Sequence, residues 1–90
     1  MLVVVPTRRF LKDSKLADRR GLDLRKLDAV IALLANGSQL PQRLRDHALA
    51  GSWLGYRDCH LEPDWLLIYK VDAERLYLVR TGTHSDLFSS

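Results

Sequence analysis

The periodicity of this chain changes once, near Leu40, and no other feature constrains the fold as strongly. Before Leu40, apolar residues recur every three or four positions, as they do on one face of a helix. After it, the segments 56–61, 65–71 and 76–81 are rich in aromatic and β-branched residues and are separated by short polar turns. Helices in one half and hairpin strands in the other predict an α+β fold, with two helices packed on an antiparallel sheet.

The first half predicts a short strand followed by the two helices. Residues 2–5 are apolar or β-branched and precede a proline, which is typical of a short strand. Thr7 is the expected N-cap of a helix that runs to about Arg20, where a glycine follows as its stop. Asp23 is expected to cap the second helix, which ends around Asn36.

Length and composition define the class of protein. A chain of 90 residues buries one core, so a single domain over residues 1–90 is expected. The longest apolar run, 29–35, is far shorter than the ~20 residues that cross a bilayer, and no signal peptide is recognisable. The single cysteine excludes an internal disulfide and fits a reducing compartment. We therefore expect a soluble, cytoplasmic protein without a membrane partner.

The expected hairpins bring polar residues to one end of the sheet. Short connections join antiparallel neighbours, so the end of the first hairpin strand, the start of the second and the end of the third lie together. Four side chains with chemical potential gather at that end. They are His60, Asp64, Arg80 and His84.

Geometry and spacing narrow the chemistry of this group. Adjacent strand residues point to opposite faces, so Cys59 and His60 do not form a nucleophile pair. The histidines lack the spacing of common zinc motifs, which disfavours a metal site, and no cofactor is expected. Imidazole is an acid or base near neutral pH and arginine binds two phosphate oxygens, so the group suits metal-independent cleavage of an RNA phosphodiester.

Four motifs after Leu40 resemble the YafQ branch of the RelE/ParE toxin superfamily. In order they are D-H-x-L-x-G-x-W (46–53), G-Y-R-D-x-H (55–60), E-P-D-W (62–65) and R-T-G-T-H-x-x-L-F (80–88). Before Leu40 the similarity is architectural only. The resemblance implies a type II toxin that cleaves mRNA in the ribosomal A site as an endoribonuclease and is neutralised by a cognate antitoxin.

The resemblance also implies roles in proton transfer. His84 and Asp64 are expected to move protons, with Asp64 as the base and His84 as the acid, because a carboxyl at its ordinary pKa is a feeble acid near pH 7. Arg80 is expected to stabilise the scissile phosphate. An alternative for Arg80 is a cross-strand ion pair, and for Asp64 a plain turn residue.

Four further positions complete the site that the resemblance implies. His47 and His60 would position the phosphate or share in proton transfer. Phe88 would orient the base or the attacking hydroxyl, and Trp65 offers a second face for stacking a base.

The partners implied are the ribosome with its mRNA and an antitoxin that is acidic and DNA-binding, in a heterotetramer or larger assembly. Four basic residues recur at helical spacing on the first helix, away from the face of Phe10, with Asp13 and Asp18 at their flanks. They are Arg8, Lys12, Lys15 and Arg19, here called the basic stripe. With a net charge of +3 and a pI of about 9.4, the basic stripe is expected to contact ribosomal RNA and to suit an acidic antitoxin.

Two other functions fit the same fold. A ParE-like toxin that binds DNA gyrase has no need of the His-Asp-Arg-His group. An inactive homologue that acts with its antitoxin as a co-repressor would retain every motif but would not arrest growth.

Overall fold

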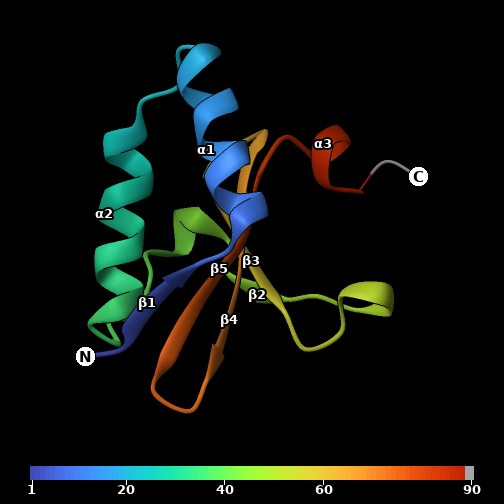
Figure 1. Cartoon of the computed structure of the whole chain (residues 1–90). Coiled ribbons are helices and arrows are strands. Elements are labelled where there is room, and N and C mark those ends of the chain that lie inside the picture. The colour runs from blue at the N-terminus through green and yellow to red at the C-terminus, as the bar shows by residue number, and fades with distance from the viewer. Residues whose placement is uncertain (89–90) are drawn as a thin grey trace.

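Five strands form one sheet in the computed structural model, which describes residues 1–88 (Figure 1). The strands are β1 (Val3–Pro6), β2 (His47–Ala48), β3 (Arg57–Glu62), β4 (Trp65–Asp72) and β5 (Arg75–Gly82). They lie side by side in the order β1-β5-β4-β3-β2. Strands β2 to β5 pair antiparallel with their neighbours, whereas β1 pairs parallel to β5.

The helices begin and end at residues with recognisable capping chemistry. They are α1 (Arg8–Arg19), α2 (Leu24–Ala35) and the short α3 (His84–Phe88), with 3-10 turns η1 (Gln42–Leu44) and η2 (Gly51–Trp53). The Thr7 hydroxyl accepts the backbone N–H of Phe10 at 3.1 Å, and Asp23 accepts that of Arg25 at 3.0 Å. Gly21, after α1, has a positive φ of 80° that favours glycine. The predicted caps and helix ends are therefore confirmed.

The α+β fold class is confirmed, and the structure adds elements that the sequence pattern does not predict. These are the parallel partner of β1, the two-residue β2 and the helix α3. The parallel pair forms because α1 and α2 carry the chain across before the hairpins return β5 to the side of β1. Among residues 1–88, no helix has the length and apolar character needed to cross a membrane.

Each face of the sheet has its own apolar cluster. On the face covered by α1 and α2, Phe10 and Val30 pack with residues such as Trp65 and Leu78. On the opposite face, Leu66, Ile68 and Leu87 pack together, next to the half-buried Trp53, Tyr56 and others. In Figure 1, α3 lies on the other side of the sheet from α2. The second, smaller cluster thus anchors the segments that carry the polar end of the sheet.

Candidate active site

The predicted meeting of three strand ends is confirmed by the register of the sheet. Glu62 at the end of β3 pairs with Trp65 at the start of β4, and Leu66 pairs with Gly82 at the end of β5. The turn between β3 and β4 contains Asp64, and α3 begins at His84 directly after β5. Side chains from three parts of the chain therefore lie within reach of one another.

His84 is held by Asp64 through two contacts. Its backbone N–H donates to Asp64 Oδ1 at 2.9 Å, and its ring Nδ1 lies 2.6 Å from the same oxygen. A proton on Nδ1 leaves Nε2 free for a substrate. The two side chains are exposed, at 52% for His84 and 66% for Asp64. The hydrogen bond from the His84 backbone and then that from its ring hold the pKa of Asp64 below its usual range, which makes this carboxylate a weaker base.

This geometry fits a different division of labour from the one expected on sequence grounds. Asp64 was expected to act as the base and His84 as the acid. One Asp64 oxygen already accepts both His84 contacts, so the carboxylate is placed to orient the imidazole. Direct proton abstraction by Asp64 fits the structure less well.

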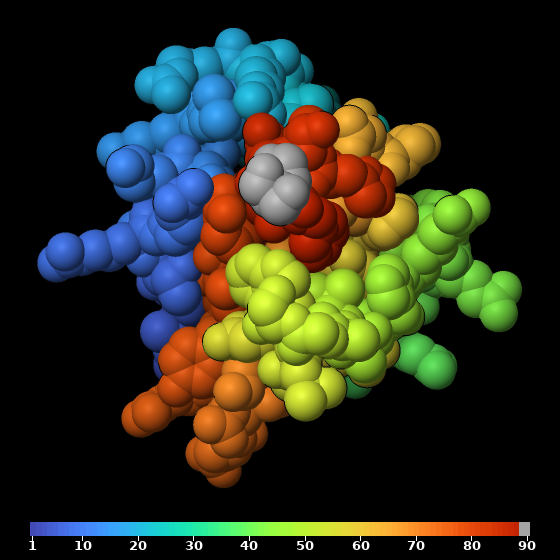
Figure 2. Space-filling model, turned by 90° about the vertical axis from the view of Figure 1, so that its right-hand side faces the viewer, coloured from blue at the N-terminus to red at the C-terminus, as the bar shows by residue number. Residues whose placement is uncertain are grey.

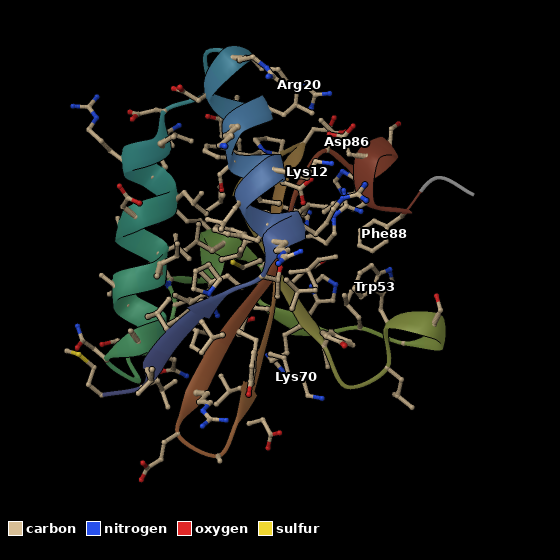
Figure 3. All side chains as sticks on the ribbon, in the orientation of Figure 1. Lys12, Arg20, Trp53, Lys70, Asp86 and Phe88 are labelled. Carbon is tan, nitrogen blue, oxygen red and sulfur yellow. The ribbon has the colours of Figure 1, made fainter. Side chains whose placement is uncertain are left out.

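A row of rings extends from His84 in both directions. Toward β2, the His84 and His60 centroids are 5.5 Å apart and those of His60 and His47 are 6.2 Å apart. Toward η2, Phe88 lies 6.4 Å from His84, and Trp53 lies 6.4 Å from Phe88. Figure 3 shows Trp53 next to Phe88, and their ring planes are nearly perpendicular, at 88°. All three histidines therefore share one surface with two aromatic rings, and Trp53 was not predicted to belong to it.

His47 is fixed by the residues around β2. Its Nδ1 faces the backbone carbonyl of Arg45 at 2.8 Å. The preceding residue, Asp46, accepts hydrogen bonds from Arg57 Nη2 at 3.1 Å and from the Tyr69 hydroxyl. Burial and the contact with Asp46 raise the pKa of the Tyr69 hydroxyl, which therefore acts as a donor. The contacts of Asp46 with Arg57 and Tyr69 thus fasten the start of β2 to the neighbouring strands.

A buried carboxyl lies beneath the histidines. Asp58 is only 3% exposed, and His47 Nδ1 lies 3.1 Å from its Oδ1, within ion-pair distance but outside hydrogen-bond geometry. That oxygen has no hydrogen-bond partner among residues 1–88. Burial raises the pKa of Asp58, and the fields of His47, His60 and His84 partly oppose this. Sequence reasoning missed Asp58, although the aspartate in G-Y-R-D-x-H was the available signal.

His60, in the middle of the row, has an environment of its own. Partial burial lowers the pKa of this imidazole, while the charge of Asp58 acts in the opposite sense. A lowered pKa increases the neutral fraction of His60 near pH 7. The neutral ring is the form that can accept a proton, and the lowered pKa also makes it a weaker base.

Arg80 forms an ion pair, and its partner comes from α1 and not from a neighbouring strand. Nε donates to Asp13 Oδ2 at 2.8 Å and Nη2 donates to Asp13 Oδ1 at 3.1 Å. The side chains are 16% exposed for Arg80 and 9% for Asp13. The expectation that Asp13 flanks the basic stripe is therefore wrong, because it lies on the buried face of α1. Nη1 of Arg80 has no hydrogen-bond partner among the described residues and remains available to an anion.

Trp65 does not offer a stacking face. It is 1% exposed within the cluster beneath α1 and α2, and its Nε1–H donates to the Thr81 hydroxyl at 2.9 Å. That hydroxyl donates in turn to the Leu66 carbonyl at 2.7 Å. The prediction that Trp65 stacks on a base is wrong, because strand alternation turns its side chain to the face opposite Leu66.

The helix α3, which carries His84 and Phe88, is fastened at its start. Asp86 accepts the backbone N–H of Thr83 at 3.0 Å and a hydrogen bond from Arg20 Nη1 at 2.6 Å. Figure 3 shows Arg20 and Asp86 next to each other, one at the end of α1 and one in α3. The Arg20 contact and the Thr83 N–H lower the pKa of Asp86 to about 2. Gly82 leaves just enough room, because a Cβ there would lie 2.9 Å from Asp86 Oδ2.

The four residues of the basic stripe are all exposed. None of them forms an ion pair with another side chain in the described part of the chain. In Figure 2, α3, drawn in red, lies between the blue α1 and the green and yellow segment that contains η1, β2 and η2. Within residues 1–88 there is also no cluster of three or more His, Cys, Asp or Glu side chains placed to hold a metal ion.

Comparisons with known proteins all identify the same family. A family model described as the YafQ bacterial toxin of type II toxin-antitoxin systems matches residues 2–89. Over 80 residues the chain is 51% identical to the mRNA interferase toxin YafQ of Escherichia coli K12, covering 88% of this chain and 87% of that protein. The crystal structure of YafQ from E. coli BL21(DE3) superposes with a TM-score of 0.94 at 44% identity, covering 99% and 100% of the two chains. YafQ in the E. coli DinJ-YafQ complex gives 0.92 at 46% identity, again covering 99% and 100%.

Proposed function

This chain belongs to the YafQ family of type II toxins, and from that premise we propose that it is an endoribonuclease that cleaves mRNA and is neutralised by an antitoxin. Its E. coli relative is named an mRNA interferase and has been crystallised with the DinJ protein. The observation that carries the proposal is His84, oriented by Asp64 at one position in a row of three imidazoles.

The proposed reaction is attack of an RNA 2′-hydroxyl on the adjacent phosphorus. The O2′–P bond forms, the P–O5′ bond breaks, and the products are a 2′,3′-cyclic phosphate and a 5′-hydroxyl. His60 accepts the O2′ proton, because its lowered pKa favours the neutral imidazole. His84, in its protonated form, donates from Nε2 to O5′, while Asp64 holds its Nδ1–H.

Three other residues support these two histidines. Arg80 presents Nη1 to the phosphorane oxygens, because Asp13 occupies Nε and Nη2. His47 lies on the other side of His60 and stabilises the same charge when it is protonated. Phe88, which is 39% exposed, offers the face on which a base stacks, and Trp53 packs edge-on against it.

We further propose that cleavage takes place in the ribosomal A site, and hence in the cytoplasm. The exposed and unpaired basic stripe on α1 is available to the phosphates of ribosomal RNA. The same positive charge favours an acidic antitoxin segment laid across the active site, where it would exclude the substrate phosphate.

The decisive experiment is cleavage of an mRNA positioned on purified 70S ribosomes, in EDTA, by the wild type and by the His84→Ala and His60→Ala proteins. We expect cleavage only with ribosomes, ends that carry a cyclic or 3′-phosphate, and a loss of roughly 10² to 10⁴ in rate for each variant. Retained activity in His84→Ala would refute the assignment of His84. If wild type arrests growth without cleaving RNA, gyrase binding replaces this proposal. If the wild type neither arrests growth nor cleaves RNA, a role as an inactive co-repressor replaces this proposal.

A further inference from the structure

A hollow of about 340 Å³ lies beside His60, the middle imidazole of the ring row. The proposed reaction makes no use of it. Its walls come from the η1 segment and from the end of β3, and they consist of Arg43, Leu44, Arg45, His60, Leu61, Glu62 and Pro63. The hollow therefore opens directly onto an imidazole of the candidate active site.

The hollow carries positive charge. Arg43 and Arg45 are both exposed, and neither side chain has a hydrogen bond or an ion pair within residues 1–88. The one acidic residue in the wall, Glu62, is engaged by Lys26 Nζ at 3.0 Å. Two guanidinium groups are thus available to an anion, and the nearby carboxylate is already compensated.

The backbone that forms the hollow is held in an unusual conformation. Arg45 adopts φ 49° and ψ 43°, the left-handed region that non-glycine residues rarely occupy. Its carbonyl lies 2.8 Å from His47 Nδ1. Arg45 therefore both lines the hollow and contacts an active-site imidazole through its carbonyl, so the hollow is joined to the candidate active site.

We propose that this hollow binds the nucleotide next to the scissile phosphate. The inference rests on the proposed RNA cleavage. The phosphate of that nucleotide pairs with Arg43 and Arg45, and its sugar packs against the exposed Pro63. Because His60 lines the hollow and also belongs to the imidazole row, a nucleotide bound there adjoins the phosphate that His60 acts on. RNA is favoured over an acidic protein segment because the arginines line the same hollow as His60, the proposed acceptor of the O2′ proton.

The test is equilibrium binding of a fluorescein-labelled, 2′-O-methyl RNA oligonucleotide that cannot be cleaved. Fluorescence anisotropy at several salt concentrations gives the slope of log K against log salt for wild type, Arg43→Gln, Arg45→Asn and the variant with both substitutions. Asn is used because it tolerates the left-handed conformation better than other residues. The matched control is Arg75→Gln, which removes one charge at the opposite end of β5.

The two substitutions together should lower the magnitude of the slope by about 0.7, the contribution in single-stranded nucleic acid of the one phosphate that both arginines contact. Each substitution alone should remove a part of this, and the control should leave the slope unchanged. The difference in slope between the hollow variants and the wild type should disappear for a shorter RNA that lacks the nucleotide proposed to occupy the hollow. Slopes equal to that of the control overturn the inference. Unchanged RNA binding with weaker binding of the antitoxin also overturns it, and assigns the hollow to a protein partner.

Cleavage of mRNA on ribosomes, measured separately, distinguishes this inference from the proposed function. If the wild type cleaves mRNA but the hollow variants bind RNA as the control does, the RNA site in the hollow is refuted and the proposed function stands. Arginine-dependent RNA binding without any cleavage refutes the proposed function and supports the hollow as an RNA site.

Discussion

Replacing Asp13 with asparagine tests how α1 and β5 are joined. The substitution keeps the size of the side chain but removes the charge that pairs with Arg80. It also replaces one of the two oxygens that accept from Arg80 Nε, Arg80 Nη2 and the Thr81 N–H with an amide NH2 that cannot accept. Breaking a fully buried pair costs roughly 3 to 5 kcal/mol. Because Arg80 keeps 16% of its surface exposed, water offsets part of this cost, and we expect a loss of about 2 to 3 kcal/mol.

A loss of that size is measurable and does not by itself unfold the protein. A domain of 90 residues has a free energy of unfolding of roughly 5 to 13 kcal/mol. The melting temperature should fall by roughly 10 to 20 °C. Urea unfolding followed by tryptophan fluorescence gives the free energy directly, and Arg9→Gln is the control. Arg9 lies 3.7 Å from the same carboxylate but is 63% exposed, so its removal should cost less than about 0.5 kcal/mol.

A double-mutant cycle decides whether the ion pair is the cause. In an Arg80→Ala background, Asp13→Asn should cost well under half of what it costs in wild type, because the lost partner is already absent. Equal costs in the two backgrounds would refute the reasoning, and would assign the effect to the helix α1 itself.

Three other perturbations have definite outcomes. Gly82→Ala should lower the rate of mRNA cleavage by about 10²-fold, because the new Cβ must displace Asp86 and with it the start of α3. An unchanged rate would show that a shift of α3 does not affect cleavage. Trp65→Phe should lower the free energy of unfolding by about 1 to 3 kcal/mol, since the Thr81 hydroxyl loses a donor, while RNA affinity stays the same. The pKa of Asp86 is depressed to about 2, so the Arg20–Asp86 contact stabilises the fold fully above the unfolded pKa of about 3.9, and this is lost as the pH falls toward 2. The difference in melting temperature between wild type and Asp86→Asn should therefore be constant above about pH 5 and vanish near pH 2.

Local rules were sufficient for the helices and for the hairpins. Thr7 and Asp23 cap the helices because their side-chain oxygens accept backbone N–H groups that the first helical turn leaves unpaired. The turns around Asp64 and Ala73 join neighbouring strands because they are short. From these local features the meeting of His60, Asp64 and His84 followed.

What the sequence did not predict depends on contacts between distant segments. Asp13 and Arg80 are 67 positions apart, and no local pattern distinguishes an aspartate that binds a strand from one that flanks a basic stripe. Trp65 adjoins Asp64 in the motif, but alternation along β4 turns its side chain into the core. The parallel pairing of β1 likewise follows from the path of the whole chain.

The alternation along β3 links the accuracy of folding to the chemistry. Asp58 and His60 face the ring row, whereas Cys59 and Leu61 lie in the cluster beneath α2. A shift of one residue in the pairing of β3 with β4 would exchange these two sets, leaving imidazole in the core and a thiol at the surface. A mispaired molecule is then both unstable and inert. Activity in this chain therefore requires the correct strand register, because only that register places Asp58 and His60 at the ring row.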